Sequence, residues 1–274
     1  MGVIGLLTDF GLTDNFVGVM KGVIYRINPQ AKIVDLCHEI ESHNIQDAGF
    51  LLQSSYPYFP QGTVFLVVVD PGVGSERKSV IVQTEKHFFV APDNGVLSFL
   101  KEKDIKRIIQ ITNEDYFLKP VSGTFHGRDI FAPVAAHLSR GEKVEKFGTT
   151  IKEIKKLKIP SPQVKKNRLM GEVMYVDRFG NLITNISQDA FLRFIEGRKF
   201  QIVVRKTRIS KISSFYQEGK EGLPIAIFGS FRNLEISLYR DDASRLLNLH
   251  KGSKIYVEKS TTRSSGILSP WGRG

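Results

Sequence analysis

The sequence predicts an α/β protein in which an N-terminal, mostly parallel sheet is flanked by helices and followed by a smaller C-terminal β-barrel-like domain. Short apolar strands alternate with amphipathic helices over the first seventy residues, and this β-α-β-α-β order is typical of parallel sheets. After residue 168 the helical periodicity nearly disappears and short strands follow one another, as in small barrels or sandwiches. The composition, 41% hydrophobic and 24% charged, is that of a globular protein.

The N-terminal elements follow from the spacing of apolar residues. We expect strands at 3–7, 32–36 and 63–69 and helices at 16–27 and 44–59. The strand at 63–69 is almost wholly apolar and β-branched, which indicates burial on both faces of the sheet. Further along we expect a hairpin at 79–84 and 87–91, a short helix at 96–100, a strand at 105–112 and a helix at 130–138.

The domain boundary is expected where the composition changes. Residues 154–168 are rich in lysine and contain Pro160 and Pro162, which favours a linker. The predicted domains are therefore 1–153 and 169–274, with 154–168 between them. In the second domain we expect strands at 171–176, 182–186, 200–204, 225–228, 234–238 and 254–258, one helix at 242–249, and a frayed end at 264–274.

Composition also narrows the class of protein. No apolar run approaches the roughly 18 residues of a membrane span, and the first residues lack the features of a signal peptide. Cys37 is the single cysteine, which excludes an internal disulfide and disfavours a cysteine-built zinc site. These features favour a cytoplasmic protein with no metal site and no redox cofactor. The net charge of +11 permits nucleic-acid binding, but the basic residues are scattered, so nucleic acid is not the expected partner.

Polar residues gather in three loops that follow strands or open a helix. These loops contain Asp9 and Asp14, then Asp70 and Arg77, then His126, Arg128 and Asp129. Because the carboxyl ends of parallel strands lie on one edge of a sheet, the loops can converge. A carboxylate, a guanidinium and an imidazole together could position and deprotonate a water molecule. Each residue alone also has a structural explanation, such as a turn cap, so the residues by themselves leave the substrate open.

Familiar nucleotide and hydrolase motifs are absent from the sequence. Gly72 and Gly74 are not extended to a dinucleotide-binding fingerprint, and there is no phosphate-loop lysine and no serine nucleophile elbow.

Five segments, taken together, resemble the S-adenosyl-L-methionine hydroxide adenosyltransferase family, relatives of the bacterial fluorinase and chlorinase. They are Leu-Thr-Asp-Phe-Gly (7–11) with Asp14, Asp-Pro-Gly-Val-Gly (70–74) with Arg77, Ala-Pro-Asp-Asn-Gly (91–95), Gly-Thr-Phe-His-Gly-Arg-Asp (123–129) and Asp-Arg-Phe-Gly-Asn-Leu-Ile-Thr-Asn (177–185). The resemblance implies hydrolysis of S-adenosyl-L-methionine to adenosine and L-methionine, by in-line attack of an activated water or hydroxide on the ribose 5′ carbon. It also implies a homotrimer with sites between one subunit's N-terminal domain and a neighbour's C-terminal domain, and no cofactor besides the substrate.

The resemblance also assigns roles to individual residues. The water-activating triad falls on Asp70, Arg77 and His126, and the ribose-binding carboxylate falls on Asp9. The methionine ammonium is expected at Asp14 and at one further carboxylate in the C-terminal domain.

In the C-terminal domain, the resemblance assigns the second carboxylate that meets the methionine ammonium to Asp177. Phe179 is expected to stack on adenine, with Asn181 at its polar edge and Phe215 or Tyr216 on its other face. Ser230 matches the segment that holds the methionine carboxylate. Residues 232–235 and 239–242 depart from the family pattern, so contacts from these two segments are not carried over.

Two alternatives to the hydrolase remain. One is a sensor that binds adenosyl compounds without converting them. The other is a halide-using adenosyl transferase, but those relatives have an aromatic hydroxyl where this chain has Asp70 and a serine where it has Gly127. A carboxylate facing the nucleophile repels halide and can accept a proton from water, which favours the hydrolytic reaction.

Overall fold

The computed structural model describes residues 2–263 and divides into two compact units, Met1–Ile159 and Pro160–Gly274. The division falls inside the lysine-rich segment 154–168. Ile154 is buried in the core of the first unit, and Gln163–Lys165 already pairs with a strand of the second unit. The frayed end expected at 264–274 lies outside the described residues.

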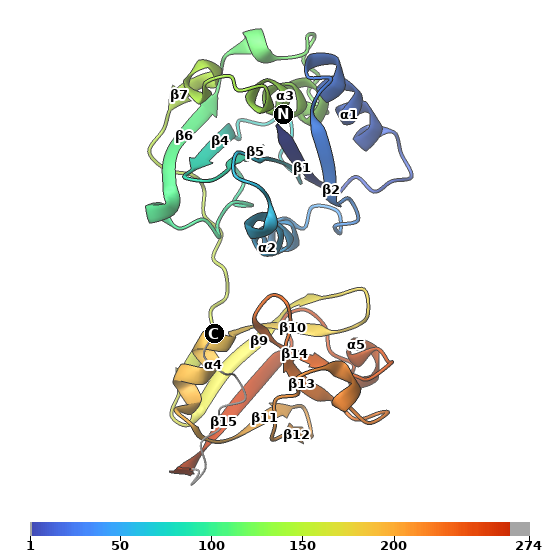
Figure 1. The fold of residues 1–274 in the computed structure, drawn as a ribbon, viewed down its shortest axis with the longest axis vertical. Coiled ribbons are helices and arrows are strands. Elements are labelled where there is room, and N and C mark those ends of the chain that lie inside the picture. The colour runs from blue at the N-terminus through green and yellow to red at the C-terminus, as the bar shows by residue number, and fades with distance from the viewer. Residues whose placement is uncertain (1, 264–274) are drawn as a thin grey trace. The chain divides into compact units, whose positions relative to one another are not determined.

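The N-terminal unit is a seven-stranded mixed sheet with helices on both faces (Figure 1). Its strands are β1 (Val3–Thr8), β2 (Lys32–Cys37), β3 (Val64–Val68), β4 (Ser79–Thr84), β5 (Phe88–Pro92), β6 (Ile105–Ile111) and β7 (Gly148–Thr150). Its helices are α1 (Phe16–Ile27), α2 (Ile45–Ser55) and α3 (Ala132–Ser139). The strand order is β2-β1-β3-β5-β4-β6-β7, with parallel pairing from β2 to β5 and antiparallel pairing beyond.

The pairing of β1 with β3 positions the loops that carry the candidate residues. Thr8 pairs with Val68, so both strands leave the sheet at the same edge. Asp9 and Asp70 follow there, as expected for the carboxyl ends of parallel strands. All five residues of β3 are buried, which confirms the prediction of a strand covered on both faces. Helices α1 and α3 cover one face and α2 covers the other (Figure 1).

Two predicted helices of this unit differ in the structure. The helix expected at 44–59 ends at Ser55, and a single turn of 3-10 helix, η1 (Tyr56–Tyr58), continues it. Pro57 lies inside that turn and has no N–H for a further α-helical hydrogen bond. The prediction of a helix at 96–100 is wrong, because these residues form only turns.

The C-terminal unit is an antiparallel, nearly closed, barrel-like sheet (Figure 1), which confirms the predicted class. Its strands are β8 (Gln163–Lys165), β9 (Arg168–Val176), β10 (Leu182–Ser187), β11 (Arg198–Val204), β12 (Thr207–Ile209), β13 (Ile225–Phe228), β14 (Asn233–Ser237) and β15 (Lys254–Arg263). Its helices are α4 (Gln188–Ile195) and α5 (Ala243–Leu247). The order is β12-β11-β15-β9-β10-β14-β13, and β8 pairs with β9.

The sequence analysis predicted a single helix in this unit, at 242–249, and did not predict helix α4. Ser187 caps α4 by accepting a hydrogen bond from the Ala190 N–H. Phe191, Phe194 and Ile195 bury one face of it, at the spacing of a short amphipathic helix. In the part of the chain that the structure describes, no helix is long and apolar enough to cross a membrane.

Candidate active site

Two loops of the N-terminal unit meet beside the end of β3. The first runs from Asp70 to Arg77, and the second is the loop before His126. At Gly74 the backbone has φ +75°, and a Cβ there would lie 2.2 Å from the carbonyl oxygen of Gly123. Only glycine fits both the left-handed backbone and this close approach, so it holds the two loops against each other.

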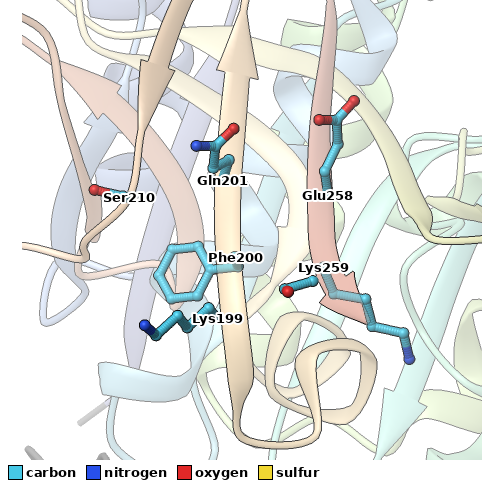
Figure 2. Close-up of a pocket in the computed structure, with 7 residues that line it drawn as sticks. Lys199, Phe200, Gln201, Ser210, Glu258 and Lys259 are labelled. Atoms are coloured by element: carbon cyan, nitrogen blue, oxygen red, sulfur yellow. The ribbon is translucent and has the colours of Figure 1, made fainter. Parts of the chain in front are cut away.

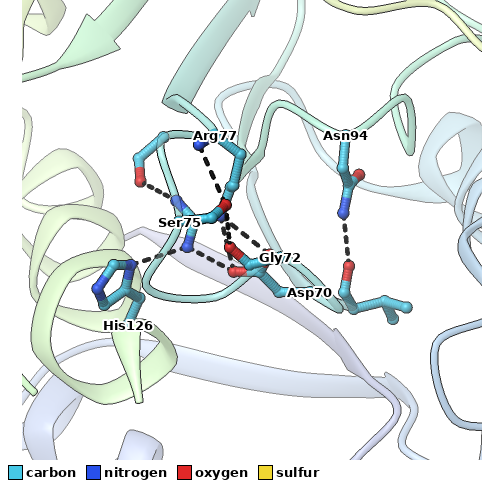
Figure 3. Close-up of polar contacts among 8 residues, drawn as sticks. Asp70, Gly72, Ser75, Arg77, Asn94 and His126 are labelled. Carbon is cyan, nitrogen blue, oxygen red and sulfur yellow. Dashed lines mark hydrogen bonds and ion pairs between the residues drawn. The ribbon is translucent and has the colours of Figure 1, made fainter. Parts of the chain in front are cut away.

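Asp70 and Arg77 form a buried ion pair in this contact region (Figure 3). Arg77 Nε donates to Asp70 Oδ1 at 2.9 Å and to Oδ2 at 3.0 Å, and Arg77 Nη2 donates to Oδ2 at 2.5 Å. The side chains are only 4% and 10% exposed, respectively. A buried carboxylate and guanidinium neutralise each other, so removal of either leaves an uncompensated charge.

His126 joins the pair through the same guanidinium (Figure 3). Arg77 Nη2 lies 2.8 Å from His126 Nδ1. Because an arginine can only donate, Nδ1 must accept, which assigns the proton of the neutral imidazole to Nε2. Burial lowers the pKa of His126, and the positive charge of Arg77 lowers it further. The structure therefore brings together the three residues that the sequence proposed as a triad, with the imidazole held neutral.

Two residues that sequence reasoning missed hold Arg77 in place. Arg77 Nη1 donates to Ser79 Oγ at 2.9 Å, and the guanidinium carbon lies 5.2 Å from the centre of the buried Phe131 ring. Ser79 begins β4 two residues after Arg77, so its position could have been read as the same side of an extended chain. Phe131 lies far away in the sequence and gave no such signal.

The loop that carries His126 is supported by Asp129, which is fully buried. Asp129 accepts bidentate hydrogen bonds from Arg128 at 2.6 and 3.0 Å, and one from the Ser122 N–H at 2.8 Å. Its backbone belongs to a π turn, η4 (Gly127–Phe131), which starts directly after His126 and precedes α3. Such turns interrupt regular helix and are frequent at functional sites. Arg128 and Asp129, candidates in the sequence, thus support the loop.

The predicted ribose residue, Asp9, lies in the loop after β1. Its Oδ2 accepts a hydrogen bond from the His43 N–H at 2.8 Å. The preceding Thr8 is buried and its Oγ1 lies 2.8 Å from His38 Nδ1, while His38 Nε2 lies 3.0 Å from Asp35 Oδ1. These contacts hold the backbone next to Asp9 and one oxygen of its carboxylate, Oδ2. The other oxygen, Oδ1, takes no part in them.

Asp14, predicted to meet the substrate ammonium, is exposed at the start of α1. It lines a hollow of about 470 Å³ together with Leu12, Asn15, Val17, Gly18, Val19 and Lys21. The described contacts do not place Asp14 against the Asp70–Arg77–His126 cluster. Within residues 2–263, no group of three or more His, Cys, Asp or Glu side chains is arranged to hold a metal ion.

In the C-terminal unit, Asp177 organises the loop between β9 and β10. Its Oδ1 accepts from the N–H groups of Phe179 and Asn181 at 2.9 Å, and its Oδ2 accepts from Asn181 Nδ2 at 2.9 Å. Asn181 is 6% exposed, whereas the ring of Phe179 is 76% exposed. The loop therefore holds a fixed amide beside a large aromatic surface that faces solvent.

Two further loops of this unit carry the remaining predicted residues. Phe215 is 56% exposed. Tyr216 is 43% exposed and its Oη donates to Glu235 Oε1 at 2.9 Å, so of the two aromatic candidates Phe215 is the more exposed. Ser230 is exposed in the turn between β13 and β14, which closes with a 2.9 Å hydrogen bond from the Arg232 N–H to the Gly229 carbonyl.

A separate hollow of about 620 Å³ is lined by residues of the neighbouring strands β11 and β15 and by Ser210 in the same unit (Figure 2). Its lining residues are Lys199, Phe200, Gln201, Ser210, Glu258, Lys259 and Ser260. None of the residues singled out in the sequence lies there, so this hollow does not belong to the predicted site.

The chain is a two-domain protein with an α/β unit followed by a barrel-like β unit, and comparison with known proteins identifies its family. The family model described as the S-adenosyl-L-methionine hydroxide adenosyltransferase N-terminal domain matches residues 4–148. The model for the C-terminal domain of the same family matches residues 171–256. The chain belongs to the S-adenosyl-L-methionine hydroxide adenosyltransferase family, as the motifs of the sequence indicated.

Individual relatives agree with this assignment. A protein of Methanocaldococcus jannaschii named (R)-S-adenosyl-L-methionine hydrolase is 40% identical over 93% of this chain and 95% of its own length. A Thermus thermophilus protein with the same name is 33% identical over 91% of this chain and 96% of its own length. The crystal structure of an uncharacterized conserved protein from Thermotoga maritima superposes with a TM-score of 0.87 at 40% identity, over 93% of this chain and all of that one. A fluorinase of Actinopolyspora mzabensis is 25% identical over 94% of this chain and 97% of its own length.

Proposed function

We propose that this protein hydrolyses S-adenosyl-L-methionine to adenosine and L-methionine, with Asp70, Arg77 and His126 activating the water. The observation that carries the proposal is the hydrogen-bonded cluster of these three side chains, with Asp70 and Arg77 buried, in a chain of this family. The names of the relatives from Methanocaldococcus jannaschii and Thermus thermophilus support the same substrate.

Each of the three side chains has a separate role in activating the water. Asp70 accepts the water proton on a lone pair that Arg77 does not occupy, since an ionised carboxylate has about four acceptor sites. The Nε2–H of His126 donates to the water oxygen and stabilises the hydroxide character that develops there. Arg77 holds the Asp70 carboxylate through hydrogen bonds from Nε and Nη2 and keeps His126 in this tautomer.

The step balances without a further reactant. The water oxygen forms a bond to the ribose 5′ carbon as the bond from that carbon to sulfur breaks. The electron pair of the breaking bond goes to the sulfonium, which becomes the neutral thioether of methionine, and the proton leaves from Asp70 to solvent. Because a cation is discharged as a negative nucleophile arrives, charge decreases toward the transition state and a pocket poor in water favours the step.

Substrate recognition is assigned to both units. Asp9 binds the ribose hydroxyls, and Asp14 and Asp177 attract the ammonium. Adenine lies on Phe179, and Asn181 reads its edge.

Two more recognition contacts complete the C-terminal part of the proposed site. Phe215 covers the second face of adenine, and Ser230 binds the methionine carboxylate. Their exposure supports this role, because a ligand can bury surface that the protein alone leaves in water.

Hydroxide is favoured over halide at two positions. Asp70 places a carboxylate at the nucleophile. At Gly127, a Cβ would lie 3.2 Å from Met20 Sδ and 3.4 Å from Val68 Cγ1, so a serine there requires its neighbours to move. Both features support a hydrolase rather than a halide-using transferase.

We also propose that the protein acts as a homotrimer in the cytoplasm, with each site shared by one subunit's N-terminal unit and a neighbour's C-terminal unit. The exposed aromatic rings of the C-terminal unit support shared sites, and a single cysteine, Cys37, suits a reducing compartment. Light scattering measures the number of subunits. Mixing Asp70→Asn and Phe179→Ala subunits after dissociation restores activity at low substrate concentration only if sites are shared.

The function is tested by incubating the purified protein with S-adenosyl-L-methionine in heavy-oxygen water. We expect adenosine and methionine in equal amounts, independent of added halide, with the label on the adenosine 5′ oxygen. Unlabelled adenosine contradicts attack by water at that carbon. Binding without conversion identifies a sensor instead, and halide-dependent formation of a 5′-halogenated adenosine identifies a transferase.

A further inference from the structure

One buried carboxylate of the C-terminal unit, Glu235, has no role in the substrate contacts proposed above. Glu235 lies in β14 and is 4% exposed. Its Oε1 accepts hydrogen bonds from Tyr216 Oη at 2.9 Å and from Ser237 Oγ at 2.7 Å. Among the ion pairs of the described residues, none involves Glu235. Residues 160–274 contain twice as many lysines and arginines as aspartates and glutamates, so basic partners are abundant in this unit and yet do not reach Glu235.

The surroundings of Glu235 disfavour the charged form of its carboxyl group. Burial raises the pKa of Glu235, and the negative charge of Asp177 raises it further. The pKa of Tyr216 is raised as well, by its own burial and then by its hydrogen bond to Glu235. Burying a carboxyl group costs free energy unless hydrogen bonds replace those to water. The two hydroxyl donors supply such bonds, and one of them belongs to a loop expected to contact the substrate.

The Tyr216 hydroxyl ties that loop to the sheet. Phe215, the preceding residue, has extended backbone angles (φ −153°, ψ 161°). Tyr216 begins a 3-10 turn, η6 (Tyr216–Glu218). The Tyr216 residue is 43% exposed, but its hydroxyl reaches inward to Glu235, while Phe215 is 56% exposed. The loop is also joined to β13 by a 2.7 Å hydrogen bond from the Ser213 N–H to the Ala226 carbonyl, and the Phe215 carbonyl accepts from the Glu218 N–H at 3.3 Å. Both are bonds between backbone groups, whereas the Tyr216 hydroxyl gives the loop a side-chain bond to β14.

Glu235 also touches the second substrate loop. A Cβ placed on Gly229 would lie 2.4 Å from Glu235 Oε2, so the carboxylate packs directly against the backbone at residue 229. Ser230 is the next residue. One buried side chain thus contacts the loop of Phe215 and the loop of Ser230.

We propose that Glu235 is a positioning residue, which orients Phe215 for adenine through Tyr216 and supports the turn that presents Ser230. The inference rests on the proposed function, because it names the support of the adenine and methionine-carboxylate contacts of that same site. It requires Glu235 as a hydrogen-bond acceptor and not as the charge that binds the ammonium.

The acceptor role is tested with Tyr216→Phe, which removes one hydroxyl and keeps the ring. We expect the KM for S-adenosyl-L-methionine and the Kd for adenosine to rise about tenfold, the effect of roughly 1.4 kcal/mol, with kcat nearly unchanged. Glu235→Leu should give at least the same rise, and the double variant should be no worse than Glu235→Leu alone, since both substitutions remove the same contact. Glu235→Gln keeps an acceptor oxygen and should restore binding close to the original value.

Tyr256→Phe is the matched control, because Tyr256 lies in β15 and Arg168 stacks on its ring, away from both loops. It should leave the KM and the Kd unchanged. Tyr216→Phe with unaltered adenosine binding overturns the inference, as does a Glu235→Gln variant as weak as Glu235→Leu.

The outcomes separate this inference from the proposed function. Turnover by the unmodified protein, together with equal adenosine binding by Tyr216→Phe, overturns the inference alone. Adenosine binding that weakens in Tyr216→Phe, in a protein that never converts S-adenosyl-L-methionine, overturns the proposed function alone.

Discussion

The N-terminal and C-terminal units hold their candidate residues in opposite ways. In the N-terminal unit, Asp70, Arg77 and His126 are hydrogen-bonded to one another, and the side chains of Asp70 and Arg77 are shielded from water. In the C-terminal unit, the rings of Phe179 and Phe215 are more than half exposed and stand on loops fixed by polar contacts behind them. Side chains that move protons need fixed partners and a low dielectric, whereas side chains that recognise an aromatic ligand need apolar surface free for it to bury.

This difference leads to a general expectation. Changes in the N-terminal cluster should lower kcat, because they alter interactions made in the transition state. Changes in the C-terminal loops should raise KM, because they remove binding shared by ground state and transition state. Substitutions in either unit can break this division, and the largest effect is expected at the N-terminal cluster.

Asp70→Asn should lower kcat by about 10²–10⁴-fold with a modest change in KM, because general-base help is typically of that size. His126→Ala should fall in the same range. Steady-state release of adenosine measures both. Asp115→Asn, an exposed carboxylate of the same unit, is the control and should keep full activity. Turnover that stays unchanged in both variants would remove the triad from the mechanism.

Phe179→Ala should raise the KM about ten- to a hundredfold and leave kcat nearly unchanged, since stacking of a base on an aromatic ring contributes about 1–3 kcal/mol. Calorimetric titration with adenosine should show the same loss. Leu223→Ala removes another exposed apolar side chain of this unit and serves as the control. A loss confined to kcat would break the proposed division between the two units.

The pH dependence of kcat/KM should report the state of His126. Its pKa is lowered from the usual value of about 6.5 by burial and by the charge of Arg77, so the imidazole stays neutral at pH 7. Below the lowered pKa a proton on Nδ1 faces the Arg77 donor and breaks their hydrogen bond. We therefore expect activity to fall about tenfold per pH unit on an acid limb that lies below pH 6.5.

A His126→Gln variant tests the origin of this limb. Glutamine has both a donor and an acceptor but does not titrate, so the variant should be slower and lack that limb. An acid limb identical to that of the unmodified protein would assign it to another group.

The smallest effect is expected on stability. His87 is 3% exposed and lies against the rings of Tyr56 and Phe65, and burial lowers its pKa. The unfolded chain thus takes up a proton near pH 6.5 that the folded chain resists, and stability falls as the pH drops from that value toward the lowered one. Calorimetry should show a melting temperature a few degrees lower at acidic pH, and His87→Leu should reduce this dependence. His250→Gln, on the surface of the other unit, should leave it unchanged.

Much of the fold follows from local sequence. The apolar run before Asp70 predicted the buried strand β3, and the change in pattern after residue 168 predicted the barrel-like unit. Two short elements were misjudged for the same physical reason. Helix α4 and the turns at 96–100 are each about two turns of helix or less, and at this length packing against neighbours outweighs intrinsic propensity.

The sequence predicted the residues of the candidate site but not the side chains that support them. The sequence named Asp70, Arg77 and His126, and the structure places them in contact. It did not identify Phe131 or Glu235 as supports, because their partners are distant along the chain and an isolated aromatic or acidic residue in a strand or helix has no local signal.

The sequence by itself determined the family, the order of most elements and the polar residues that follow the strands β1 and β3. Strand ends, turns and motifs depend on neighbours within a few residues, so they can be read along the chain. Only the tertiary structure decided that Arg77 neutralises Asp70, that the proton of His126 lies on Nε2, and that Tyr216 points inward to Glu235. The last two are set by contacts between separate segments, 49 residues apart for Arg77 and His126 and 19 for Tyr216 and Glu235. The first depends on how the loop from Asp70 to Arg77 folds back on itself and is buried.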